Sequence, residues 1–72
     1  MEKAKFFEEL KDTLELDDIV NEATTLHLSS LATLSVIVMI DENFEKQIRA
    51  TDLVKVNSVI TLMELIGLEN FK

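Results

Sequence analysis

The stretch HLSSLATLSVIVMIDENF, residues 27–44, decides the fold that this sequence predicts. Its centre, residues 31–40, carries no charge and is rich in β-branched side chains, so propensity alone leaves a strand open. The whole segment from Ser30 to Glu45, about 16 residues, is long for a strand, however, and Ser29 or Ser30 can cap the start of a helix. The stretch therefore predicts a helix over residues 30–45.

The flanking sequence predicts a helix on each side of this one. Residues 2–16 are amphipathic, with apolar side chains three or four positions apart. Residues 59–66 follow Ser58, a good N-cap, and precede Gly67, where a left-handed residue is expected. Leu68 then stands where a side chain often packs back on the last turn. Residues 51–55 (TDLVK) predict one short capped turn of helix.

Residues 17–29 break the helical pattern and form a long connection for so small a protein. Such a loop is either functional or crosses the core, with Ile19, Val20 and Leu26 as its anchors. The chain has one Gly and no Pro, so it lacks the usual punctuation of strand-and-turn folds. We therefore predict an all-α fold over residues 1–72, one domain: a small antiparallel helical bundle of three main helices and one short helix, with a long first loop.

Composition restricts the classes of function that remain. Seven basic residues oppose 14 acidic ones, a net charge of −7, which argues against nucleic acid and anionic membranes as partners. Basic patches on other proteins fit this charge, although the charge also simply favours solubility. With no Cys and one His, we expect neither a disulfide nor a metal site. The charged N-terminus and the short apolar run predict a cytoplasmic protein.

The predicted second helix is apolar on two sides. At 100° per residue, one arc faces the core and continues into Ile48. This core arc contains Thr33, Val36, Ile37, Ile40 and Phe44. A second arc lies beside three acidic residues and contains Leu31, Leu34 and Val38. A second apolar arc is either buried between other helices or used for a partner. We expect a docking surface that includes the neighbouring Asp41, Glu42 and Glu45.

Several short motifs between Phe6 and Ile66 agree in order and spacing with those of the acyl carrier protein family, which the sequence resembles. The triplet Ser29-Ser30-Leu31 stands at the place of the family's Asp-Ser-Leu motif. The following ATLSVIVMIDENF is similar to the family's second helix, including its acidic end and its Phe. Downstream, Asp52-Leu53 and Ser58-Val59 resemble the family's short third helix and the start of its last helix.

The resemblance implies that Ser30 carries a covalent phosphopantetheine arm, derived from coenzyme A, and that acyl groups travel on this arm as thioesters. The implied partners are a phosphopantetheinyl transferase and acyl-loading or acyl-transferring enzymes with basic docking patches, bound through Ser29 and the second arc. The protein would be a monomeric carrier in a specialised fatty-acid, polyketide or other biosynthetic pathway. We do not expect it to be an enzyme, because its apolar helices offer no convergent set of titratable groups.

The sequence departs from the family at three places. Ser29 replaces the Asp that helps the transferase engage the site, His27 stands where a Gly is common, and Ala32 and Ser35 stand where many carriers have acids. The first departure favours an alternative, an unmodified interaction module in which a serine only caps the helix. A peptidyl or aminoacyl carrier is a further alternative. The interior positions Ile37, Ile40, Val54, Val59 and Leu62 either shelter a short acyl chain or form plain core.

Overall fold

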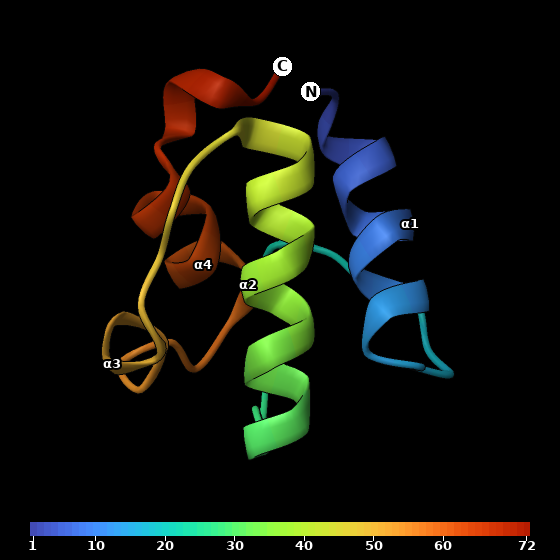
Figure 1. Cartoon of the computed structure of the whole chain (residues 1–72). Helices are drawn as coiled ribbons and strands as arrows, with labels where there is room; N and C mark the ends of the chain where they lie inside the picture. Colours follow the sequence, from blue (N-terminus) through green and yellow to red (C-terminus); the bar gives the residue numbers. More distant parts are fainter.

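The apolar stretch forms the central helix of the protein. The computed structural model describes residues 1–72 and contains four α-helices, no strand and a terminal 3-10 turn (Figure 1). The elements are α1 (Lys3–Thr13), α2 (Ser30–Phe44), α3 (Ala50–Leu53), α4 (Val59–Ile66) and η1 (Leu68–Asn70). The predicted all-α fold, with three main helices, one short helix and a long first loop, is confirmed.

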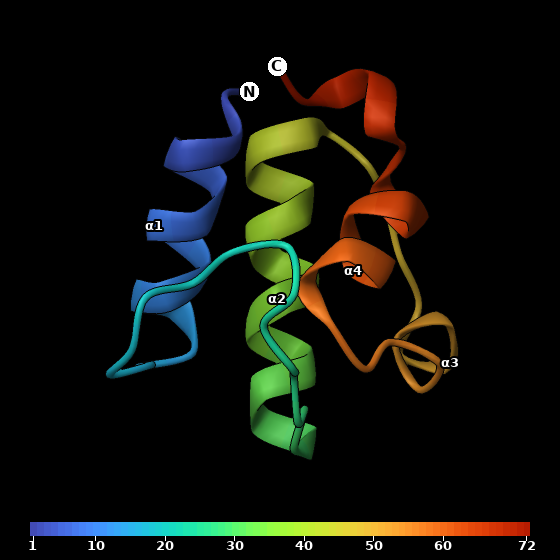
Figure 2. The ribbon, with the colours of Figure 1, turned by 180° about the vertical axis from the view of Figure 1, so that it is seen from behind.

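Helix α2 lies between the other elements. Helix α1 runs antiparallel along one side of it, and α3 and α4 lie on the other side (Figure 1). The connection from α1 to α2 crosses the back of the molecule (Figure 2). The Cα radius of gyration is 10.9 Å, close to the roughly 11 Å expected for a compact chain of this length. None of the helices has the length and apolar character needed to cross a membrane.

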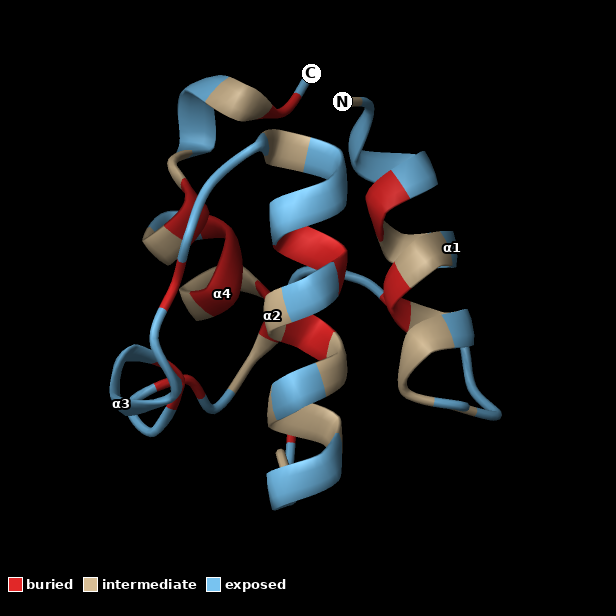
Figure 3. Ribbon diagram, viewed as in Figure 1, coloured by how far each residue is buried: buried red, intermediate tan, exposed pale blue.

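The core is entirely apolar and forms where the helices face one another (Figure 3). Val36 and Ile40 of the predicted core arc are fully buried, and Ile37 is partly buried. Met39, which we did not assign to the core, is buried as well. Because α2 packs against α1 as well as α4, its buried arc is wider than the one-sided arc that we predicted.

Three phenylalanine rings join the two ends of the chain to α2. The Phe6 and Phe71 rings are 4.8 Å apart between centroids, and Phe44 lies 5.3 Å from Phe71 and 6.1 Å from Phe6. These tilted and edge-to-face arrangements are the favourable ones for aromatic pairs. The cluster fixes the C-terminal segment after α4 against α1.

Two of the predicted helices extend too far at their C-terminal ends. Helix α1 ends at Thr13 rather than at residue 16, because Glu15 has a left-handed backbone with φ 52°. Helix α2 ends at Phe44, because Glu45 has the same φ and donates its N–H to the Asp41 carbonyl. A left-handed residue of this kind is a common helix terminator. Helix α3 begins one residue earlier than predicted and ends at Leu53.

The long first loop is tied to the start of α4. Thr25 and Ser58 form an isolated antiparallel bridge, and the Leu26 N–H donates to the Asn57 carbonyl at 2.9 Å. Val20 and Leu26 are buried, as predicted for anchors, but Ile19 is 84% exposed, so its assignment as an anchor was wrong. Successive side chains of extended backbone point to opposite sides, so Ile19 and Val20 cannot both face the core.

The end of α4 is closed by polar groups rather than by Leu68. Gly67 has φ 112°, which agrees with the positive φ expected there. Leu68 is exposed, however, so the expected packing on the last turn was wrong. The Lys46 ammonium donates to the Ile66 carbonyl at 2.8 Å, and the Asn70 amide donates to the same oxygen at 3.1 Å. These donors satisfy the carbonyl group that the helix end leaves free.

Candidate functional site

The two serines at the start of α2 have different surroundings. Ser29 is the N-cap, and its hydroxyl oxygen accepts the Ala32 N–H at 3.2 Å. Ser30 is the first residue of α2, and it is exposed. No hydrogen bond within the chain engages the Ser30 hydroxyl, which is exposed to solvent. The first turn of α2 contains no acidic residue.

A stripe of exposed apolar side chains follows Ser30 along α2. Leu31 is 77% exposed, Leu34 59% and Val38 48%. We call these three residues the apolar stripe. Although α2 lies between other helices, the three apolar residues that we assigned to the docking surface are therefore exposed, and the alternative in which this second arc is buried between helices is wrong.

Three acidic residues continue the same face at the far end of α2. Asp41, Glu42 and Glu45 are all exposed, and we call them the distal acids. At 1.5 Å per residue they lie roughly 16–22 Å along the helix axis from Ser30. The face of α2 is thus apolar near Ser30 and acidic far from it.

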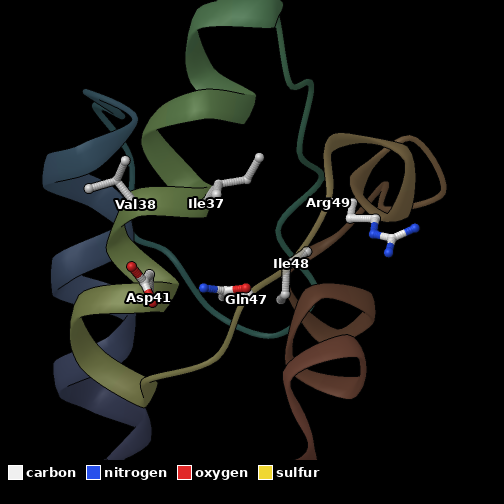
Figure 4. A pocket seen from close by; sticks show the side chains of 6 residues that line it. All are labelled: Ile37, Val38, Asp41, Gln47, Ile48 and Arg49. Carbon is white, nitrogen blue, oxygen red and sulfur yellow. The ribbon is translucent and has the colours of Figure 1, made fainter.

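A groove runs between α2 and the segment that leads to α3. It has a volume of about 470 Å³ and is lined by Ile37, Val38, Asp41, Gln47, Ile48 and Arg49. Figure 4 shows the Gln47 amide nitrogen turned toward Asp41, whereas the Arg49 side chain points away from both. We call this the α2–α3 groove. Gln47 and Arg49 were not predicted as site residues, since the irregular segment between the helices has no periodicity to indicate which side chains face α2.

A second hollow lies beside the serine pair. Its volume is about 600 Å³, and Ser29, Thr33, Val54 and His27 are among the residues that line it. Val54 is 82% exposed, so its assignment to the interior was wrong. A single turn of helix buries only one side, and in α3 that side is taken by Leu53. The position of Val54 directly after Leu53 is the signal that indicates its exposure. His27 is an exposed loop residue.

The other interior candidates are used for packing. Ile40, Val59 and Leu62 are fully buried within the apolar core, and Ile37 is partly buried. No group of three or more His, Cys, Asp or Glu residues is placed to hold a metal ion. The chemistry of this surface is thus that of the exposed Ser30 hydroxyl, an apolar stripe and a set of exposed carboxylates. Comparisons with protein-family models, curated proteins and solved structures find no match to the chain.

Proposed function

We propose that this protein is an acyl carrier in which Ser30 holds a phosphopantetheine arm. The observation that supports this most directly is the division between the two serines. Ser29 uses its hydroxyl to cap α2, and Ser30 presents an unengaged hydroxyl at the surface beside it. A serine that only capped the helix would not need an exposed neighbour of the same kind.

The residues around Ser30 fit a phosphodiester. Free N–H groups and the helix dipole at the start of α2 favour a phosphate, and no carboxylate stands in the first turn to repel it. In the attachment step the Ser30 oxygen would bond to the phosphorus next to pantetheine. The pyrophosphate bond of coenzyme A would break, adenosine 3′,5′-bisphosphate would depart as the leaving group, and the hydroxyl proton would pass to the transferase. Once attached, the arm supplies a thiol, a group that this chain lacks because it has no Cys.

The face of α2 would bind the enzymes that load and unload the arm. The apolar stripe begins directly after Ser30, and the distal acids lie at the other end of α2. A complementary partner would place an apolar surface at its entrance and Lys or Arg side chains farther away. Charges at the rim of such a contact mainly steer association, and the buried apolar side chains contribute most of the affinity.

The test is intact mass after incubation with coenzyme A and a broad-specificity phosphopantetheinyl transferase. We expect the wild type and Ser29→Ala to gain one phosphopantetheine and Ser30→Ala to gain none. Ser29→Asp restores the acid of the family motif and should be modified at least as fast as the wild type. If neither the wild type nor Ser29→Asp gains mass, the carrier function is wrong.

The second candidate is an unmodified interaction module. The same three exposed apolar side chains favour it, because a docking surface needs no prosthetic group. The absence of any mass gain, together with retained folding of the Ser30→Ala variant, would support this candidate.

A further inference from the structure

The α2–α3 groove lies on the same face of α2 as Ser30. Ser30, Leu34, Ile37 and Asp41 are spaced by four, three and four positions, which places them along one side of a helix. With a rise of 1.5 Å per residue, Ile37 lies roughly 10 Å and Asp41 roughly 16 Å along the axis from Ser30. Ile37 and Asp41 both line the groove. The groove is therefore aligned with the attachment residue.

The groove is within reach of a group attached at Ser30, a step that rests on the proposed function. An extended phosphopantetheine arm measures roughly 17 Å at ordinary bond lengths. Its thiol end therefore reaches the level of Asp41, which lines the groove together with Gln47.

The far end of the groove offers acceptors for a positively charged donor. An ionised carboxylate such as that of Asp41 only accepts hydrogen bonds. Glu42 and Glu45 are exposed on the same end of α2, and the guanidinium of Arg49 points away from Asp41 (Figure 4). Ile37, Val38 and Ile48 supply an apolar floor. A carboxylate-bearing acyl group would be repelled at this end, and an ammonium would be attracted.

The interior does not offer a better place for a long aliphatic chain. Val36, Ile40, Val59 and Leu62 lie between α2 and α4 and are fully buried in one continuous apolar cluster. A chain inserted there would have to displace close-packed side chains. The open groove is large enough for a short acyl group and the end of the arm.

We propose that the α2–α3 groove binds a short acyl group that carries a protonated amine, with the Asp41 carboxylate as its acceptor. The cargo of this carrier is thus an aminoacyl group rather than an alkyl chain or a dicarboxylic acid. Asp41 and Gln47 determine the specificity for this cargo, and Ser30 provides the attachment.

The experiment loads Ser30 with three arms that end in β-alanyl, butyryl or malonyl groups, each joined through an amide in place of the thioester to prevent hydrolysis. Butyryl has the shape of β-alanyl with a methyl group in place of the ammonium. The readout is the set of amide NMR shifts at Val38, Gln47 and Arg49, including the Gln47 side chain. We expect the β-alanyl arm to perturb these signals most, and added salt to reduce the effect.

The variants are Asp41→Asn and its matched control Asp18→Asn, which makes the same change at an exposed position of the first loop, outside the groove. Asp41→Asn should lower the occupancy of the groove by β-alanyl by up to about fivefold, as expected for one exposed charge pair. Asp18→Asn should leave the occupancy nearly unchanged. Equal perturbation by butyryl or malonyl, or no effect of Asp41→Asn, would overturn the inference. Failure of the loading itself, seen by mass before any NMR, would instead overturn the proposed function.

Discussion

Ser29 and Ser30 show how neighbouring residues of one type acquire different roles. The Ser29 hydroxyl oxygen accepts a hydrogen bond from the Ala32 backbone N–H at 3.2 Å. Ser30 lies one position farther along, inside the helix, and its hydroxyl accepts no hydrogen bond from a backbone N–H. We predict that Ser29→Ala lowers the free energy of unfolding by about 0.5–1 kcal/mol, the usual value for an exposed cap. Ser30→Ala should change it by less than about 0.5 kcal/mol. Urea denaturation of both variants measures the difference, and a larger loss for Ser30→Ala would contradict this assignment.

Two leucines test the distinction between the core and the apolar stripe with the same substitution. Leu62 is fully buried and Leu34 is 59% exposed. We expect Leu62→Ala to cost about 2–5 kcal/mol, because it removes buried area and leaves a cavity. Leu34→Ala should cost less than about 0.5 kcal/mol. Equilibrium denaturation checks both values, and a large loss for Leu34→Ala would show that the stripe is part of the core.

Among the elements, the first loop and α4 depend on each other. The N–H groups of Val59 and Ile60, which a helix start leaves without intrahelical partners, donate to the Thr24 and Glu22 carbonyls at 2.9 and 3.0 Å. The loop therefore caps α4 with its backbone, in addition to the Ser58 side chain. This explains why a connection of such length persists without secondary structure of its own.

We predict that the Val59 and Ile60 amides exchange slowly with solvent, in contrast to the Leu31 amide in the first turn of α2. Leu26→Ala removes a buried anchor of the loop. It should speed the hydrogen exchange of the Val59 and Ile60 amides, because the carbonyls that accept their hydrogen bonds lie in the same loop. Ile19→Ala, at an exposed loop position, is the control and should change neither. Hydrogen exchange followed by NMR provides the measurement. Exchange at Val59 as fast as at Leu31 in the wild type would show that the loop does not protect α4.

For the whole molecule, the net charge of −7 opposes a compact fold through self-repulsion. We predict that Tm rises by several degrees on adding NaCl, since salt screens this repulsion. For a domain of this size, each kcal/mol gained raises Tm by roughly 4–8 °C. A variant with Asp17→Asn and Asp18→Asn, both at exposed loop positions, should start from a higher Tm and respond less to salt. A fall in Tm with salt would mean that favourable ion pairs outweigh the repulsion.

The sequence predicted those parts of the molecule that depend on local pattern. Helical spacing identified Val36 and Ile40 as core residues and left Leu31, Leu34 and Val38 on the outside, as the structure shows. Tertiary packing decided the rest. Met39 is buried because α1 lies against α2, and Val54 is exposed because the short α3 turns only Leu53 inward. The groove around Gln47 and Arg49 comes from an irregular segment, and no periodicity in the sequence predicts its path.

The cluster of Phe6, Phe44 and Phe71 also has a consequence for the ultraviolet spectroscopy of the protein. The chain contains no Trp and no Tyr, so its only aromatic chromophores are phenylalanines, which absorb weakly and at short wavelength. We expect the near-ultraviolet circular dichroism signal to come mainly from these packed rings, with Phe7 the one other phenylalanine of the chain. A tryptophan introduced at Leu31 would be the sole strong fluorophore of the chain. Its emission would report events on the α2 face while the dichroism of the rings reports, independently, whether the core remains packed.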